Sequence, residues 1–393
     1  MGVYYRDSTG SLSTVTVTGI QQPNAFGCQP GANGGVYAAT DSSTNAPTTG
    51  NGDSTQWVPP PSGYPAANLT ATTLVVSNYD KDGITCADVG TACTIASSTV
   101  TASGPIPTNA APSENNAQNG IEIFAATAKI TSTKVTGSSY TAPQYCPFGT
   151  CGVNGNPDST YYTASGILII NAGDVTLKSD TVSKNDANVY ELWYPSYGGP
   201  ATQGTWTVSN SQVNKGTNNT GTFAGTSKVP SGDGFGDGID LDGTGSAGGS
   251  TIVQGNTVSG NPEYGIGLLD ATGSIIGGAA SGQPNTTTLG GGDGIYVGDN
   301  PYTGTSGVAA NTGSSTGNAI TSNVSSSNNG DGILADVTAQ DSGTTFTSKP
   351  LKRNVRYNAE DLSNGGSGDF GTDNSWSGTM CTPAGHSAPS GIC

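Results

Sequence analysis

The chain has 393 residues, with 61 Gly and only 12 Lys and Arg against 28 Asp and Glu, which gives a net charge of −16. The basic residues are scattered and form no stripe that could neutralise a phosphate backbone, so nucleic acid is not an expected partner. No apolar run approaches the roughly 20 residues that cross a bilayer, and no basic amphipathic helix is present, so no membrane partner is expected. Good helix formers are scarce, while Gly, Ser, Thr, Asn, Val and Ile are abundant, which favours β-structure.

One pattern recurs along the chain: a Gly, an aliphatic residue, a variable residue and a second apolar residue. Its copies begin at Gly2, Gly35, Gly83, Gly120, Gly166, Gly238, Gly265, Gly294 and Gly332, with a tenth at Asn188. This alternation is typical of a β-strand that places one row of side chains inward.

A second apolar strand, ending in a polar turn, lies between most copies, at residues 15–19, 129–137, 175–185, 208–216, 252–261 and 320–328. Two strands per repeat cannot bury a face alone, whereas repeats stacked on one another can. The tightest spacing, from Gly166 to Asn188, is about one turn of a three-faced parallel β-helix. Other spacings between copies are longer, and their additional residues are rich in Pro, Ser and Asn. These residues predict loops at the coil corners, at residues 39–68, 104–119, 138–165, 217–237 and 300–316.

The predicted architecture is all-β: a single-stranded right-handed parallel β-helix of about ten coils over residues 1–353, forming a rod about 50 Å long. Residues 354–393 lose the pattern and are predicted to be a C-terminal cap or tail. At the other end the pattern starts at once, so we expect an open first coil that could stack on another copy. The alternatives are a cut chain, or residues 20–34 folding back as the cap.

The cysteines fall into three local pairs, none with the spacing of a metal site, and one residue is left over. The expected disulfides are Cys86–Cys93, Cys146–Cys151 and Cys381–Cys393, and the remaining residue is Cys28. Disulfides imply an oxidising compartment, so a secreted or extracellular protein is predicted. Cys28 is either a buried thiol or a bridge to another chain.

The coils resemble the repeat of the pectate-lyase-like superfamily of parallel β-helix proteins. The resemblance lies in turns such as Asn256-Thr257-Val258-Ser259-Gly260-Asn261, followed by Gly-Ile-x-Leu. The superfamily includes pectate lyases, polygalacturonases, epimerases, phage tailspikes and adhesins, so the resemblance implies the fold and leaves the reaction open.

Three carboxylates, Asp237, Asp240 and Asp242, form the candidate catalytic cluster. If Ile239 and Leu241 point inward, alternation aims Asp240 and Asp242 outward about 7 Å apart on one strand. Asp237-Gly238-Ile239-Asp240 resembles the Asn-Thr-Asp-Gly-Ile-Asp motif of polygalacturonases, although that family's Gly-His-Gly and Arg-x-Lys motifs are missing. The competing interpretation places these Asp residues at solvated corners before Gly.

Calcium is the candidate cofactor, because clustered carboxylates bind hard cations. One candidate pair is Asp80 and Asp82, in a segment that resembles the start of a calcium loop but has Val89 in place of its final Glu. The other pair is Asp240 and Asp242. A lyase would also need a base, for which Lys184 and Lys215 occupy equivalent places on neighbouring coils, where exposed turn residues are the simpler interpretation.

The aromatic residues Tyr190, Trp193 and Tyr194 crowd one coil, and Tyr296 follows on a later one. Rings beside carboxylates form a sugar-binding platform, since they cover the apolar faces of a sugar while acids accept hydrogen bonds from its hydroxyl groups. The alternative is that the rings pack the long loop 195–237 onto the rod.

The leading functional hypothesis is a secreted, non-catalytic β-helix that acts as an extracellular structural or binding rod, for glycans or for its own copies. The alternative is a polysaccharide-active enzyme centred on Asp237, Asp240 and Asp242, either a polygalacturonase-like hydrolase or a calcium-dependent lyase.

Overall fold

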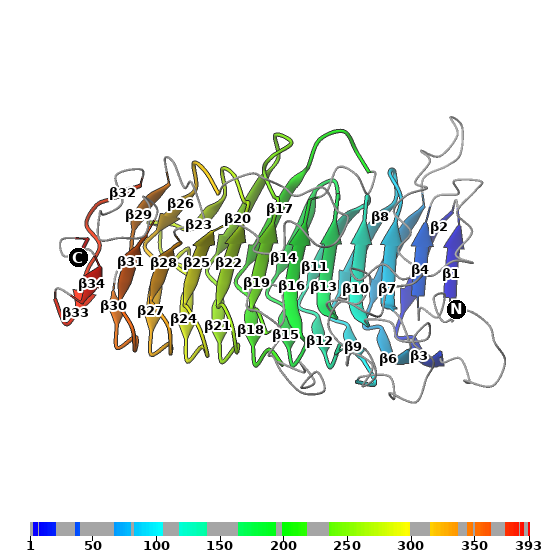
Figure 1. Ribbon diagram of the computed structural model, residues 1–393. Coiled ribbons are helices and arrows are strands. Elements are labelled where there is room, and N and C mark those ends of the chain that lie inside the picture. The colour runs from blue at the N-terminus through cyan, green and yellow to red at the C-terminus, as the bar shows by residue number, and fades with distance from the viewer. Residues whose placement is uncertain are drawn as a thin grey trace, which may run out of the picture.

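The chain folds into a rod of stacked coils, with its two termini at opposite ends (Figure 1). The structure is a computed structural model that describes residues 3–6, 8–20, 36–39, 67–79, 82–104, 118–139, 164–193, 199–217, 236–298, 315–336, 344–348, 350–362, 374–384, 386–388 and 392–393. Within these ranges it contains strands and turns and no helix. None of the described residues therefore belongs to a helix long and apolar enough to span a membrane.

The strands form three parallel sheets, and each full coil adds one strand to each sheet. Sheet A contains β1 (Val3–Arg6), β4 (Val36–Ala39), β7 (Asp82–Ala87), β10 (Asn119–Phe124), β13 (Ser165–Ile170), β16 (Ala187–Leu192), β19 (Ile239–Asp242), β22 (Ile266–Leu269), β25 (Ile295–Gly298), β28 (Ile333–Ala335), β31 (Ala359–Asp361) and β34 (Ser387–Ala388). Sheet B contains β2 (Thr9–Ser13), β5 (Asn68–Thr72), β8 (Ala92–Ala96), β11 (Thr127–Thr131), β14 (Val175–Lys178), β17 (Thr205–Ser209), β20 (Ser250–Gln254), β23 (Ile275–Gly277), β26 (Ala319–Thr321), β29 (Thr345–Thr347) and β32 (Ser375–Trp376). Sheet C contains β3 (Thr16–Ile20), β6 (Val75–Tyr79), β9 (Thr99–Thr101), β12 (Lys134–Thr136), β15 (Thr181–Ser183), β18 (Gln212–Asn214), β21 (Thr257–Ser259), β24 (Thr286–Thr288), β27 (Val324–Ser326), β30 (Leu351–Lys352) and β33 (Cys381–Thr382).

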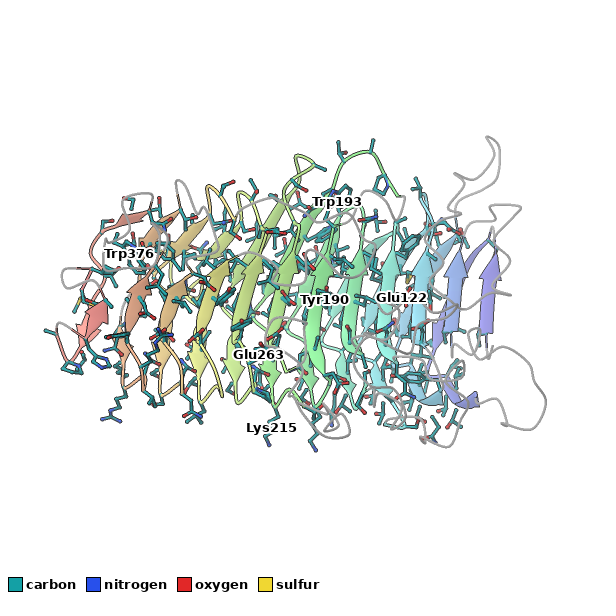
Figure 2. All side chains as sticks on the ribbon, viewed as in Figure 1. Glu122, Tyr190, Trp193, Lys215, Glu263 and Trp376 are labelled. Carbon is teal, nitrogen blue, oxygen red and sulfur yellow. A yellow bond between two sulfur atoms is a disulfide. The ribbon has the colours of Figure 1, made fainter. Side chains whose placement is uncertain are left out.

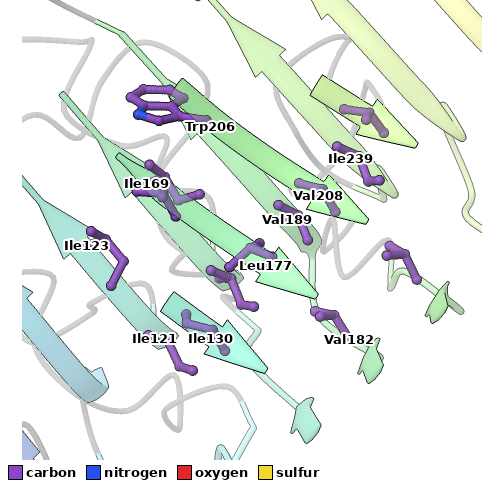
Figure 3. Close-up of a cluster of buried hydrophobic side chains, with 14 of the residues drawn as sticks. Ile121, Ile123, Ile130, Ile169, Leu177, Val182, Val189, Trp206, Val208 and Ile239 are labelled. Carbon is purple, nitrogen blue, oxygen red and sulfur yellow. The ribbon is translucent and has the colours of Figure 1, made fainter. Parts of the chain in front are cut away.

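The core is a set of apolar columns that run along the axis of the rod. The register of sheet A aligns Ile121, Ile167, Val189 and Ile239, one residue from each successive coil, and all are fully buried. Leu177 and Val208 of sheet B and Val182 of sheet C face them from the other sides (Figure 3). Because side chains alternate along a strand, the aliphatic residues of the repeat pattern supply these columns. The prediction of a parallel β-helix is confirmed.

The corner between sheets B and C is the tightest of the three. In most coils it has two residues, of which the first adopts the left-handed conformation, with φ of 48° at Ser97, 51° at Ser132 and 59° at Ser179. From Ser98 to Asn323, the last residue of the corner points inward, and its side chain accepts the main-chain N–H of the equivalent residue in the previous coil; the first two coils carry Val15 and Leu74 there. Asn256 N donates to Asn285 Oδ1 at 3.0 Å in this way, which satisfies an N–H that the turn would leave unpaired.

The longest connections all join sheet A to one of the other two sheets. They are residues 21–35, 40–67, 102–118, 137–164, 215–238 and 299–318. The predicted loops therefore start and end at the two corners that flank sheet A.

The segment after Asn354, predicted to be a cap or tail, contributes β31 to β34. These strands extend all three sheets, so the coil architecture continues past residue 353. Whether the segment also acts as a cap stays a prediction. Two predicted disulfides are present, Cys86–Cys93 inside the core and Cys381–Cys393 near the C-terminus. Cys28, Cys146 and Cys151 lie outside the described residues.

Candidate functional site

The candidate catalytic strand β19 has the alternation that the sequence predicts. Ile239 and Leu241 are fully buried in the core, so Asp240 and Asp242 lie on the outer face of sheet A. The two carboxylates are nevertheless only 1% and 2% exposed, and Tyr190 donates a hydrogen bond to Asp242 Oδ2 at 3.1 Å. They are thus components of a packed outer layer. Figure 2 shows Tyr190 on β16, the strand before β19.

Asp237 lies at the corner that leads into β19 and is fully buried, so the prediction of a solvated corner is wrong. Its Oδ1 accepts the main-chain N–H of Tyr264, the equivalent residue of the next coil, at 3.0 Å. The same contact recurs further along the rod, where Asp293 Oδ1 accepts the N–H of Asp331 at 2.6 Å and Asp331 Oδ1 that of Tyr357 at 2.7 Å. The Asp-Gly-Ile sequence therefore marks a carboxylate that links one coil to the next.

Burial of these corner carboxyl groups raises their pKa values. The pKa of Asp237 rises to about 7 through loss of solvation, which the Tyr264 N–H partly offsets. The pKa of Asp293 rises to about 6 for the same reason. Asp331 reaches a pKa of about 8, through loss of solvation first and then through the charge of Asp293 and a hydrogen bond with Glu360. At neutral pH, Asp331 therefore holds a proton, which a hydrogen-bonded pair of carboxyl groups can share.

Arg356 is the cation in contact with this pair. Its guanidinium group lies 3.7 Å from Asp331 Oδ2 and 3.0 Å from Glu360 Oε2, and its side chain is 53% exposed. Asp331, Arg356 and Glu360 thus form one ion-paired group at the edge of sheet A, partly open to solvent.

A pair of tyrosines packs beside these acids. The rings of Tyr264 and Tyr296 are stacked, with centroids 4.4 Å apart, and the Tyr296 hydroxyl donates to Asp336 Oδ2 at 2.6 Å. Two glycines make room for the rings: a Cβ at Gly267 would touch the Tyr264 ring, and one at Gly298 would collide with the Tyr296 hydroxyl. Leu269, Leu334 and Leu362 complete a small apolar cluster on this face, separate from the main core.

The predicted aromatic residues do not form one platform. Tyr190 and Tyr296 lie on the outer face of sheet A, but Trp193 is 2% exposed and packs inside the core, 6.2 Å from Trp206. Trp193 lies two residues after the inward Glu191, so the alternation of β16 continues and points its ring into the core, away from the face that Tyr190 occupies. Tyr194 lies outside the described residues.

The second candidate calcium site contains Asp82, which is nearly buried at the start of β7. Asn119 Nδ2 bridges Asp82 Oδ1 and Glu122 Oε2, at 3.2 and 2.9 Å. Asp80, its predicted partner, lies outside the described residues. Among the residues that the structure describes, no group of three or more His, Cys, Asp or Glu is arranged to hold a metal ion.

Lys184 and Lys215 occupy equivalent turns, as the sequence predicts. Both have a left-handed backbone, with φ of 60° and 54°, and Lys184 N donates to the main-chain oxygen of Lys215. Both side chains are exposed, and Figure 2 shows Lys215 at the lower edge of the rod.

The sequence alone did not identify Glu360, Arg356 or Tyr264 as members of the site. The repeated Asp-Gly-Ile at Asp293 and Asp331 was the available signal, because it places both carboxyls at the same corner of successive coils.

Neither a protein-family model nor a curated protein sequence matches the chain. Among solved structures, it is similar to the A-module of the mannuronan C-5 epimerase AlgE6 from Azotobacter vinelandii, with 11% identity, a TM-score of 0.44, and coverage of 96% of this chain and 75% of that one. The Dettilon tailspike protein gives 14% identity and a TM-score of 0.33 over 81% of this chain and 63% of its own length, so the chain spans less than two thirds of the tailspike. A pectate lyase gives 13% identity and a TM-score of 0.31 over 62% of this chain and 54% of that one. The three parallel sheets, each receiving one strand per coil, show that the chain is a parallel β-helix protein.

Proposed function

We propose that the protein is a secreted, glycan-binding β-helix whose binding site lies along the outer face of sheet A. The observation that carries the proposal is the placement of the longest connections, which all flank sheet A, while the corner between sheets B and C stays short in most coils. Binding residues concentrate on loops around a rigid scaffold. The disulfides agree with an oxidising compartment.

The side chains of this face suit a sugar. Tyr190 and Tyr357 are partly exposed, and rings of this kind cover the apolar face of a pyranose. Arg356 is next to Tyr357 in the sequence, and Glu263 precedes Tyr264 at the same edge of the sheet; they offer donors and an acceptor for hydroxyl groups. The buried Asp240 and Asp242 and the stacked rings of Tyr264 and Tyr296 form the packed layer that supports these exposed side chains.

The charge of the face favours neutral glycans over polyuronates. Besides Asp331, which holds a proton at neutral pH, the carboxyl groups on the face and at its edge include Asp240, Asp242, Glu263, Asp293, Asp336 and Glu360. Arg356 is already paired with two of them, so a polyanion would meet net repulsion at this face.

The test is binding to immobilised neutral polysaccharides and polyuronates, for the wild-type protein and for Tyr190→Ala and Tyr357→Ala. We expect each variant to bind a neutral glycan about tenfold more weakly, because one stacking contact is lost. Gln212→Ala, on the exposed face of sheet C, is the matched control and should bind normally. Equal binding by all four proteins, or a preference for polyuronates, would contradict the proposal.

A polysaccharide-active enzyme is the second candidate function, and the carboxyl pair Asp331–Glu360 favours it. A carboxyl group that stays protonated at neutral pH can act as a general acid. The earlier centre of Asp237, Asp240 and Asp242 stays a prediction for the same reaction class. Assays for new reducing ends and for unsaturated products, with Asp331→Asn and Asp237→Asn, test both centres.

Calcium binding and self-association stay predictions. A calcium site at Asp82, or at Asp240 and Asp242, would raise the melting temperature in calcium relative to chelator, because a ligand of the native state stabilises it. Stacking through β1, β2 and β3, the first strands of the three sheets, would give a dimer in sedimentation, and a link through Cys28 would make it sensitive to reductant.

A further inference from the structure

A carboxyl group lies inside the apolar core of the rod. Glu191 occupies an inward position of β16, where its register partners are Ile169 and Leu241, and it is fully buried. Neither of its oxygens makes a well-formed hydrogen bond within the described part of the chain. A buried acid without a partner is costly, so its presence in an apolar column calls for a chemical explanation.

Two other polar side chains are buried in this part of the rod: Thr251 on the next coil, beside Glu191, and Gln203 on the segment between β16 and β17, in contact with Thr251. Thr251 points inward from β20, is fully buried, and lies close enough to Glu191 to lower that group's pKa. Gln203 is 4% exposed, and its Nε2 donates to Thr251 Oγ1 at 3.4 Å. A hydroxyl group therefore touches a primary amide next to a carboxyl group.

The backbone around Gln203 holds its amide in this position. The main-chain N–H of Gly245 donates to Gln203 Oε1 at 2.7 Å, so the amide carbonyl is already polarised. A Cβ at Gly249 would lie 2.5 Å from the Cβ of Gln203, so only Gly allows this approach. Trp206 is the register partner of Thr251, and with Trp193 it shields the group from water.

We propose that Thr251 and Gln203 join in an intramolecular ester bond, with Glu191 as the proton carrier. Thr251 Oγ1 attacks the Gln203 side-chain carbonyl carbon, and an O–C bond forms while the C–Nε2 bond breaks. Glu191 takes the hydroxyl proton with one oxygen and delivers its own proton to the departing nitrogen with the other. The products are an ester and ammonia, no oxidant or reductant is needed, and Glu191 ends in its starting state.

The site supplies the groups that such a step requires. The oxyanion that develops on Gln203 Oε1 faces the Gly245 N–H, the usual arrangement for stabilising a tetrahedral intermediate. Burial raises the pKa of Glu191 to about 8, so at neutral pH the group holds the proton that the leaving amine needs. Holding the hydroxyl and amide in contact removes most of the entropic cost of bringing them together.

The bond would tie the segment between β16 and β17 to the following coil, across 48 residues of sequence. Such a link resists opening of the corner, which suits a rod exposed outside the cell. It does not depend on the glycan-binding proposal, because all three residues face the core.

The test is the intact mass of the purified protein, compared with Thr251→Val, Thr251→Ser and Glu191→Gln. We expect the wild-type protein and the Ser variant to be lighter than their sequences by about 17 Da, the mass of one ammonia. The Val variant, which lacks the nucleophile but keeps the shape, should have its full mass. The Gln variant should retain a large uncross-linked fraction when freshly prepared.

Peptide mapping locates the bond, and hydroxylamine should release the linked peptides because it cleaves esters. Succinimide formation at Asn-Gly sequences causes the same mass loss, but it would persist in Thr251→Val and would not link two peptides. Recovery of the Gln203 peptide with an intact amide from the wild-type protein would overturn the proposal, as would equal mass deficits in the wild-type and Val proteins.

Discussion

Asp180 is the ionisable member of the hydrogen-bonded ladder at the corner between sheets B and C, whose other members from Ser98 to Asn323 are Ser, Thr and Asn. Its Oδ1 accepts the N–H of Thr133 at 2.8 Å, while its Oδ2 has no partner among the described residues. Burial raises its pKa to about 6. An acid whose pKa is higher in the folded state stabilises the fold below its unfolded pKa and loses that contribution as the pH rises through the folded value.

Asp180→Asn should therefore raise the free energy of unfolding at pH 7 by about 2 kcal/mol, because the amide keeps the acceptor and cannot ionise. Urea unfolding at pH 4 and pH 7 checks this, and the gain should nearly vanish at pH 4. The reverse change, Asn285→Asp, is the comparison: it removes an amide that donates to Val253 O and Asn323 Oδ1, so it should destabilise at both pH values and more strongly at pH 7. A gain of equal size at both pH values would contradict this explanation.

Two substitutions of Asp237 test whether its hydrogen bond to the next coil stabilises the fold. Asp237→Asn keeps an oxygen for the Tyr264 N–H and should leave stability near the wild-type value or above it at pH 8. Asp237→Ala leaves that N–H unsatisfied and should cost about 1–3 kcal/mol. Thermal unfolding of the two variants at pH 8 measures the difference, and equal stabilities would show that the corner contact contributes nothing.

The asparagine ladder determines how one coil is held on the next. Asn285 accepts from both Asn256 N and Asn256 Nδ2 at 3.0 Å, and donates to Val253 O and Asn323 Oδ1 at 2.7 and 3.0 Å. Because it is fully buried, each of these groups would be left without a partner if the side chain were removed.

Asn285→Ala should lower the free energy of unfolding by about 2–4 kcal/mol. The control is Asn214→Ala on β18, whose side chain is partly exposed and should tolerate the change within about 0.5 kcal/mol. Chemical denaturation of both variants decides the matter. A small loss of unfolding free energy for Asn285→Ala would mean that water molecules replace the hydrogen bonds of the removed side chain.

Several buried acids along the rod share a raised pKa, and they act together on the stability of the whole molecule. The pKa is raised to about 6 for Asp180 and Asp293, to about 7 for Asp237, and to about 8 for Glu191 and Asp331. All five bind protons more tightly when folded, so stability falls as the pH rises from about 4 to about 8. Protonation also reduces the repulsion within a chain of net charge −16.

The melting temperature should therefore be highest at acidic pH, near 4, and should decline steadily toward pH 8. Scanning calorimetry across this range gives the measurement, with the Asp180→Asn and Asp237→Asn double variant showing a flatter profile. A maximum above pH 7 would show that these carboxyl groups are ionised in the folded protein at little cost.

The Cys86–Cys93 disulfide closes the core near the N-terminal end of the rod, and both residues are buried. Its loop spans 7 residues, so the loss of chain entropy alone is worth about 2 kcal/mol. The double substitution Cys86→Ala, Cys93→Ala should lower the melting temperature. Adding a reductant to this variant should cause no further loss at this site, because the disulfide is no longer there. An unchanged melting temperature would show that this disulfide does not stabilise the fold.

The sequence by itself determined the strands, the stacking and the direction of most side chains. Local alternation in Gly-Ile-Asp-Leu, repeated along the chain, is enough to place Ile239 and Leu241 inward and Asp240 outward. The two observed disulfides followed from spacing alone. Even Glu191 had a signal, because it fills the fourth position of the repeat, where most other copies carry an apolar residue.

Only the tertiary structure decided which side chains from different coils meet. The register between coils brings Glu360 to Asp331, and Gln203 to Thr251, and no local pattern encodes a contact across a corner with a variable connection. Burial was undetermined for the same reason: outward alternation predicts a direction, and the depth of Asp240 depends on what the neighbouring coils place over it. Long-range packing therefore sets the chemistry of residues whose positions the repeat had already fixed.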